Sequence, residues 1–432
     1  MSSMINIIMP KFQRFGMIRK LHTIISQKTI KPSFSTPPHL KTHNLSLIDH
    51  LSPNIHMPCV FYYKNCTKGD INILKKSLSQ SLTQYYPLAG RLIAPHIDCN
   101  DEGVEFVEAS IDTRIDEFIL KKDQDETLDQ LIPNALGCDV NKTSPNVIAI
   151  QLSHFTCGGA AVAVSISHQA SDASTLVNFV NHWATITRGG SPINPSFFSS
   201  TMSNFKFPEF TIVETPKVKY ATRKFVFPNS KLNELKNKIN AMGTSPMNPT
   251  RVESLTSLIF KCAADAATTK SGSSQPSSLH QAVNLRGNTN ANFHKLASRN
   301  CFAMAVAKIK DSGQIELNEV ITSLRKERME LQEVREVEEV GKKMVNSWLT
   351  FMDDQIRSYA FSSVCRLPFY QVDFGWGKPA QVMLRTGNMD ANFIYLMDTP
   401  FEDGIEATVQ LEEEEMIIFQ NNKELQTYAE DI

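Results

Sequence analysis

One histidine, followed four residues later by an aspartate, has the types and spacing to do chemistry: His168 and Asp172. An imidazole with an ordinary pKa of about 6.5 can take a proton from an alcohol at neutral pH, so His168 is a candidate general base. Asp172 would hold the imidazole or the turn around it. Alone, this spacing occurs by chance in many sequences, and a histidine hydrogen-bonded in the core is the alternative interpretation.

A second motif lies far downstream, at Asp373-Phe374-Gly375-Trp376-Gly377. The two glycines allow a tight backbone path, and the tryptophan between them can wedge between packed layers. An aspartate precedes the pair and a proline follows it. The composition therefore predicts a structural turn rather than a reactive site.

The elements around His168 must present it rigidly. Two runs, Asn146 to Leu152 and Ala160 to Ser167, have strand character, and the Cys157-Gly158-Gly159 segment between them predicts a hairpin. The stretch from Ala173 to Thr187 carries its apolar residues on one helical face. His168 is thus expected where a buried strand gives way to a turn and a helix, a position that suits a catalytic side chain.

Other segments give a coarser outline of the chain. Helical spacing predicts a helix from Ile71 to Tyr85 and a charged helical stretch from Glu316 to Met344. Residues Gly189 to about Lys219 are rich in Pro, Ser, Phe and Asn without a clean period, which indicates a crossover between domains. The Ser-rich stretch from Thr268 to Ser278 is expected to be a surface loop.

Composition excludes several classes of protein. The 432 residues carry a net charge of -1, so no basic field is available to hold nucleic acid or an anionic membrane. The eight cysteines form no C-x-x-C pair, which excludes the common zinc layouts and indicates reduced thiols in a cytoplasmic protein. No apolar run reaches the roughly 18–20 residues that span a bilayer. Nucleotide-binding glycine motifs are missing as well.

The two motifs, about 200 residues apart, resemble those of the BAHD family of plant acyl-CoA-dependent acyltransferases. The resemblance extends from about Ile25 to Ala429 and is closest to the alkaloid-acetylating branch. Further segments match family landmarks in order, among them Tyr86-Pro87-Leu88-Ala89-Gly90-Arg91, Thr250-Arg251-Val252-Glu253 and Asn284-Leu285-Arg286.

The resemblance implies an α/β fold of two chloramphenicol-acetyltransferase-like domains with a solvent channel between them. The expected division is a flexible N-terminal extension at 1–24, an N-terminal acyltransferase domain with the His168 motif at 25–190 plus about 370–393, a crossover linker at 191–219, and a C-terminal acyltransferase domain at 220–369 plus about 394–432.

The resemblance also assigns roles to residues. His168 would be the general base, while Asp172 would pair with Arg286 and fix the turn. Asp373, Phe374, Gly375, Trp376 and Gly377 would support the channel wall. Thr250, Arg251 and Asn300 would contact coenzyme A. No metal and no bound cofactor are expected, since acyl-CoA is a co-substrate.

The expected reaction moves an acetyl group from acetyl-CoA to a hydroxyl of a small specialised metabolite such as an alkaloid, by a cytoplasmic monomer. A malonyl, benzoyl or other acyl donor, or an amine acceptor, remains open. So does a member without turnover that acts as a binding protein. Departures from the family pattern motivate these alternatives: Ala173 and Arg299 stand where Gly is usual, and Val364 and Thr408 stand where Trp is common.

Overall fold

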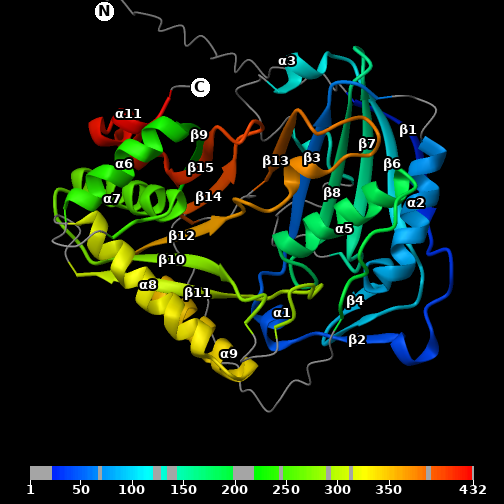
Figure 1. Cartoon of the computed structure of the whole chain (residues 1–432), viewed down its shortest axis with the longest axis horizontal. Coiled ribbons are helices and arrows are strands. Elements are labelled where there is room, and N and C mark those ends of the chain that lie inside the picture. Colours follow the sequence, from blue (N-terminus) through cyan, green and yellow to red (C-terminus); the bar gives the residue numbers. More distant parts are fainter. Residues whose placement is uncertain are drawn as a thin grey trace, which may run out of the picture.

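Two six-stranded sheets, each covered by helices, make up the body of the protein (Figure 1). The computed structural model describes residues 22–66, 71–119, 128–133, 144–197, 218–242, 247–288, 293–310, 315–385 and 391–430. The expected α/β class with two sheet-rich domains is confirmed. The exact domain boundaries stay a prediction.

The first sheet is built mainly from the N-terminal half of the chain. Its strands, in spatial order, are β1 (His22–Ile30), β6 (Val104–Ile111), β7 (Ile148–Phe155), β8 (Ala160–Ser167), β3 (His56–Tyr63) and β13 (Gln381–Leu384). Helices α2 (Ile71–Gln84) and α5 (Ala173–Thr187) lie side by side on one face, where Leu78 and Trp183 join the core. Every residue of β8 is buried, because layers cover both faces of the sheet.

The second sheet belongs to the C-terminal half. Its strands run in the order β11 (Phe302–Ile309), β10 (Ser277–Asn284), β12 (Arg357–Ser363), β14 (Phe393–Asp398), β15 (Gly404–Glu412) and β9 (Tyr220–Pro228). Its core is one large apolar cluster shared with the surrounding helices. These helices are α6 (Asn229–Ala241), α7 (Arg251–Ser271), α8 (Leu317–Glu333), α9 (Val337–Phe351), α10 (Glu413–Gln420) and α11 (Lys423–Tyr428).

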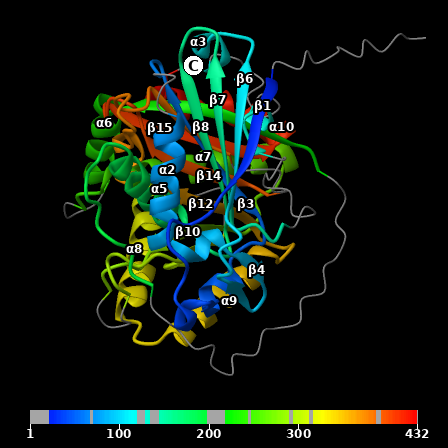
Figure 2. The same ribbon diagram turned by 90° about the vertical axis from the view of Figure 1, so that its right-hand side faces the viewer.

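Smaller elements complete the described chain. A three-stranded sheet consists of β2 (Thr42–Asn44), β5 (His96–Asp98) and β4 (Arg91–Ile93). The short helix α1 (Leu47–Leu51) lies against α9, and α3 (Ile115–Ile119) lies near the top of the first sheet (Figure 2). Single 3₁₀ turns occur at Pro38–Leu40, Tyr86–Ala89 and Phe369–Gln371.

One strand ties the two halves together. β13, from late in the chain, pairs antiparallel with β3, so that Gln381 faces Tyr62 and Leu384 faces Cys59 (Figure 1). The chain then returns to the second sheet at β14. The halves are therefore joined by the crossover after α5, by the segment that leads to β13 and by the segment that returns from it.

Most local expectations agree with the structure. The helix over Ala173–Thr187 has the expected bounds, and the hairpin before it is formed by β7 and β8. The expected crossover falls largely outside the described residues, since 198–217 are not described.

Two local boundaries were wrong. The surface loop expected over Thr268–Ser278 is much shorter, because α7 continues to Ser271 and β10 begins at Ser277; Gly272, at φ 71°, ends the helix in the left-handed conformation. The charged stretch Glu316–Met344 is two helices separated at 334–336. Residues 22–24 of the expected N-terminal extension lie in β1, where His22 pairs with Ile111, and residues 1–21 lie outside the described residues.

Candidate active site

His168 lies at the end of β8, in the turn that leads into α5. Its backbone N–H donates to the carbonyl of Ile55 at 2.8 Å. The helix begins because Asp172, in extended conformation, accepts the N–H of Thr175 at 2.9 Å through Oδ1. A doubly covered strand on one side and a capped helix on the other thus fix the backbone that carries the imidazole.

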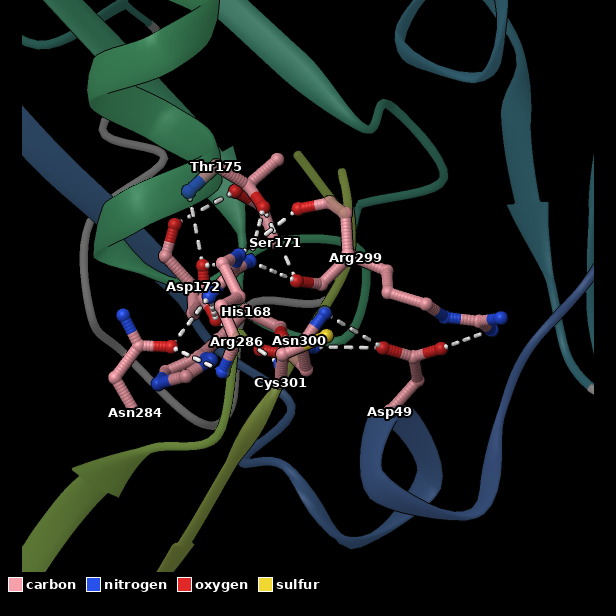
Figure 3. Close-up of polar contacts among 11 residues, drawn as sticks. Asp49, His168, Ser171, Asp172, Thr175, Asn284, Arg286, Arg299, Asn300 and Cys301 are labelled. Atoms are coloured by element: carbon pink, nitrogen blue, oxygen red, sulfur yellow. Dashed lines mark hydrogen bonds and ion pairs between the residues drawn. The ribbon is translucent and has the colours of Figure 1, made fainter. Parts of the chain in front are cut away.

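Arg286 from the second domain pairs with Asp172 (Figure 3). Arg286 Nη1 donates to Asp172 Oδ2 at 2.7 Å and Nη2 donates to Oδ1 at 2.9 Å, a fork-to-fork geometry that carries both charge and orientation. The two side chains are 5% and 11% exposed. Cys301 N–H donates to Oδ2 as well, at 3.0 Å. These contacts occupy the carboxylate and hold the turn against the second domain.

The electrostatic environment keeps His168 neutral at physiological pH. Burial lowers the pKa of His168 below its ordinary 6.5, while its own backbone carbonyl, Asp172, Asn300 and Asp49 act in the opposite direction without cancelling the effect. A neutral imidazole has one ring nitrogen free to accept a proton. The ring lies 5.9 Å from that of Phe302, centroid to centroid.

A cavity of about 320 Å³ opens onto His168. Both domains contribute to its wall, since β3 and α5 of the first face β10, β11 and β12 of the second. Apolar side chains dominate, and the lining includes Ile55, Met57, Leu176, Phe302, Val364, Leu367, Leu384, Phe393 and Tyr395. Such a cavity suits a largely apolar small molecule with one reactive polar group.

A second cavity of about 250 Å³ lies at the start of α7. Thr250 caps that helix, and Arg251, Arg328 and Arg366 all contribute to the wall. The two cavities share Ala282, Asn284, Ser363 and Cys365 as lining residues, so they adjoin. A helix N-terminus together with three guanidinium groups is suited to bind phosphate.

Two of these arginines are held by the same carboxylate. Arg251 Nη2 donates to Asp398 Oδ1 at 3.0 Å, and Arg251 Nη1 donates to Asn229 at 2.7 Å. The backbone N–H of Arg366 donates to Asp398 Oδ2 at 2.6 Å, with Arg366 in the left-handed region at φ 66°. The arrangement places the Arg366 side chain on the cavity wall while Asp398 anchors its backbone.

Asn300, which the resemblance places among the coenzyme A contacts, lies elsewhere. Its side chain is buried behind His168 and donates to Asp49 and to the His168 carbonyl. It is not among the lining residues of either cavity, whereas Thr250 and Arg251 are.

The Asp373 motif forms a compact turn against α5. Asp373 Oδ1 accepts the N–H groups of Gly375 at 2.7 Å and Gly377 at 2.9 Å, and both glycines have positive φ, 97° and 85°. Phe374 meets Trp183 edge-to-face at 4.7 Å, and Trp376 meets Tyr63 at 5.4 Å. None of the five motif residues lines either cavity.

Several residues of the site escaped the sequence reasoning. Arg328 and Arg366 line the second cavity, Arg385 lines the first and pairs with Asp129, and Asp49 contacts Asn300. Arg328, Arg366 and Arg385 lie in no motif, and only the fold brings them to the cavities, whereas Asp49 belongs to the capping box of α1, a local signal that the Ser46-x-x-Asp49 spacing carries. Among the described residues, no group of three or more His, Cys, Asp or Glu side chains is arranged to hold a metal ion. Within the same ranges, no helix is long and apolar enough to cross a membrane.

Comparison with known proteins shows which family and which relatives this chain resembles. A family model described as "Transferase family" matches residues 21–426. Diaboline synthase from Strychnos sp is 35% identical, with 94% of this chain and 91% of that protein covered. A 17,18-epoxy-17-hydroxycur-19-ene N-malonyltransferase from Strychnos nux-vomica is 33% identical, with 97% and 94% covered.

Two further matches are a relative named as an acetyltransferase and a solved structure. Stemmadenine O-acetyltransferase from Catharanthus roseus is 34% identical, with 91% of this chain and 94% of that protein covered. Among solved structures, that of vinorine synthase superposes with a TM-score of 0.81 at 30% identity, covering 95% of this chain and 98% of the other.

Proposed function

Because the chain belongs to the Transferase family of acyl-CoA-dependent (BAHD) acyltransferases, we propose that it transfers an acetyl group from acetyl-CoA to a hydroxyl of an alkaloid-type metabolite. The observation that carries the proposal is the position of His168, half-buried and neutral, on a cavity walled by both domains. Acyl transfer to specialised metabolites is the shared activity of the relatives. Our proposal further specifies the acetyl donor, the hydroxyl acceptor and the catalytic residues.

In the proposed reaction, His168 takes the proton of the acceptor hydroxyl. The oxygen attacks the thioester carbonyl carbon, the tetrahedral intermediate collapses, and the carbon–sulfur bond breaks. The proton on His168 passes to the leaving thiolate, which restores the base. Holding both substrates in line contributes as much as ~7–11 kcal/mol in intramolecular models, and a positioned base adds about 10²–10⁴-fold.

Coenzyme A would occupy the second cavity. Its phosphates would meet Arg251, Arg328 and Arg366 at the start of α7, while Thr250 caps the helix beside them. The thioester would then extend past the shared wall at Ala282 and Asn284 toward His168. In this proposal Asn300 supports the histidine from behind instead of contacting the coenzyme.

A malonyl donor is the second candidate. Arg385 lines the His168 cavity and could orient a carboxylate, and one relative is named as an N-malonyltransferase. Against it, Arg385 already pairs with Asp129, so a malonyl group would have to compete with that carboxylate. The same relative makes an amine the alternative acceptor.

A non-catalytic role finds less support. His168, Asp172 and Arg286 are all present, and the last two form the buried pair described above. A cytoplasmic location is also part of the proposal, and the buried free thiols of Cys59, Cys99, Cys262 and Cys301 support it because they suit a reducing compartment. A monomeric state is proposed with it, on the family resemblance alone.

The deciding experiment is a thiol-release assay with mass detection of products, using acetyl-, malonyl- and benzoyl-CoA and a panel of hydroxylated and amine-bearing alkaloids. We expect a product heavier by one acetyl group, and a loss of about 10²–10⁴-fold in kcat for His168→Ala at unchanged folding stability. Wild-type kcat in that variant would refute the general base. A malonylated product alone would select the second candidate.

A further inference from the structure

Arg299 is an unusual side chain for the interior. It is among the largest fully buried residues of the described chain, and its side chain is 2% exposed. A buried guanidinium is costly unless a partner offsets its desolvation. Its Nη2 donates to Asp49 Oδ2 at 2.7 Å (Figure 3). The same nitrogen donates to the Asn44 carbonyl at 3.2 Å. Asp49 is equally buried, at 1% exposure.

Asp49 accepts hydrogen bonds from two segments of the chain, the start of α1 and residues 299–300. Oδ2 accepts the N–H and the hydroxyl of Ser46, both at 2.7 Å, which also forms the capping box of α1. Oδ1 accepts the backbone N–H of Asn300 at 3.2 Å and its side-chain amide at 2.9 Å. Burial works to raise the pKa of Asp49, but the charge of Arg299 and these hydrogen bonds outweigh it and lower the pKa. The carboxylate is therefore ionised and fully engaged.

Asn300 links Asp49 to the backbone of His168. The same amide nitrogen that donates to Asp49 donates to the His168 carbonyl at 2.7 Å. That carbonyl belongs to the backbone of the proposed base, and it acts to raise the pKa of the ring, against the larger effect of burial. Because Asn300 holds that carbonyl, it fixes the backbone from which the imidazole projects.

The Arg299 backbone is coupled to the other ion pair. Its carbonyl accepts Arg286 Nη2 at 2.6 Å and the Thr175 hydroxyl at 3.0 Å. The segment 299–301 is thus held by Asp49 on one side and by Asp172 and its partners on the other. Arg299 itself lines neither cavity, so its influence on the reaction must be indirect.

We propose that Arg299 and Asp49 form a positioning pair that acts through Asn300 on the backbone of His168 and so fixes the orientation of the base. The inference rests on the proposed function of His168. It assigns a role to the arginine that stands where the family usually has glycine. Because small misplacements of a catalytic group cost about 10²-fold in rate, the pair is expected to act on kcat rather than on substrate affinity.

The test compares two breaks of a buried ion pair. Arg299→Met removes the charge beside Asp49, and Arg357→Met is the matched control, since Arg357 pairs with Glu412 and Glu415 on β15 and α10. We expect Arg299→Met to lower kcat roughly 10–100-fold, with KM for acyl-CoA little changed. Arg299→Lys, which keeps the charge, should retain more of the rate. Arg357→Met should lower thermal stability and leave kcat per folded molecule intact.

Two further measurements separate positioning from mere stability. In an Asn300→Ala background, Arg299→Met should cause no further loss of kcat. The reason is that Arg299 acts on His168 only through the Asn300 side chain, which this background already lacks. If Arg299→Met does not fold, the double variant Arg299→Met with Asp49→Asn leaves no uncompensated charge and should show the same low kcat.

A readout independent of turnover is the imidazole resonance of His168 followed by NMR. We expect it to shift in Arg299→Met and to stay in place in Arg357→Met. Wild-type kcat and an unmoved His168 resonance in folded Arg299→Met would overturn the positioning pair, while an inactive His168→Ala would leave the proposed function standing. An inactive wild type would instead count against the proposed function, and the resonance would still decide on the pair.

Discussion

The two ends of α5 lie against different kinds of structure. At its N-terminus, Asp172 caps the helix and pairs with Arg286 in a buried network of charges next to His168. At its C-terminus, Arg188 donates to the carbonyl of Asp373, and Trp183 in the last turns meets Phe374. At the N-terminal end, burial of the charged groups is offset only by their pairing with each other. At the C-terminal end, burial of the aromatic rings is itself favourable.

The difference indicates how the protein divides its tasks. Charges at the N-terminal end set orientation and pKa near the cavity, so changes there should affect rate and stability together. Aromatic contacts at the C-terminal end fix where the helix lies on the sheet, so changes there should affect stability alone. Both ends act on one rigid element of 15 residues.

The largest effect is expected from Asp172→Ala. It strands Arg286, which is 5% exposed, and removes the cap of α5, so the free energy of unfolding should fall by ~3–5 kcal/mol and kcat should fall as well. Chemical denaturation and steady-state kinetics measure the two. A variant as stable and active as the wild type would show that the charged end is dispensable.

Phe374→Ala should break the other end without touching the reaction. Phe374 is 3% exposed and contacts both Trp183 and Tyr63, so truncation should lower the free energy of unfolding by ~3–5 kcal/mol. The kcat of the remaining folded enzyme, measured well below the unfolding temperature, should match the wild type. A strong loss of kcat in fully folded protein would contradict the proposed division.

The smallest effect is expected in the pH profile. Since the pKa of His168 lies below 6.5, the neutral base persists to lower pH than in free imidazole, and kcat/KM should reach half its maximum below pH 6.5. The charge of Asp172 acts to raise that pKa, so Asp172→Asn should move the midpoint further down. Phe374→Ala should leave it in place; a midpoint above 6.5 in the wild type would contradict the burial argument.

Local sequence patterns were enough to predict the secondary structure around His168. Apolar periodicity gave the bounds of α5, and a Gly-Gly turn between two apolar runs gave the hairpin before it. The pattern failed where short-range signals were ambiguous. Ser-rich composition suggested a loop up to Ser278, although helical propensity carries α7 to Ser271 and only Gly272 stops it.

The supporting contacts of the site lie outside such reasoning. Asp49 and Arg299 are 250 residues apart, so no local pattern in the sequence pairs them. Arginine and aspartate are usually exposed, so the sequence alone predicts both residues at the surface. Only the fold shows that they are buried as a pair. Arg366 is likewise placed by a backbone contact to Asp398 that no periodicity reveals.

The pairing of β13 with β3 has a consequence for the growing chain. At about 5–20 residues per second, synthesis needs roughly 10–40 s to proceed from the end of β8 to β13. Throughout that interval one edge of β3, an apolar strand, has no neighbour, and such an edge invites aggregation. We therefore expect a fragment that ends before residue 381 to be prone to aggregate.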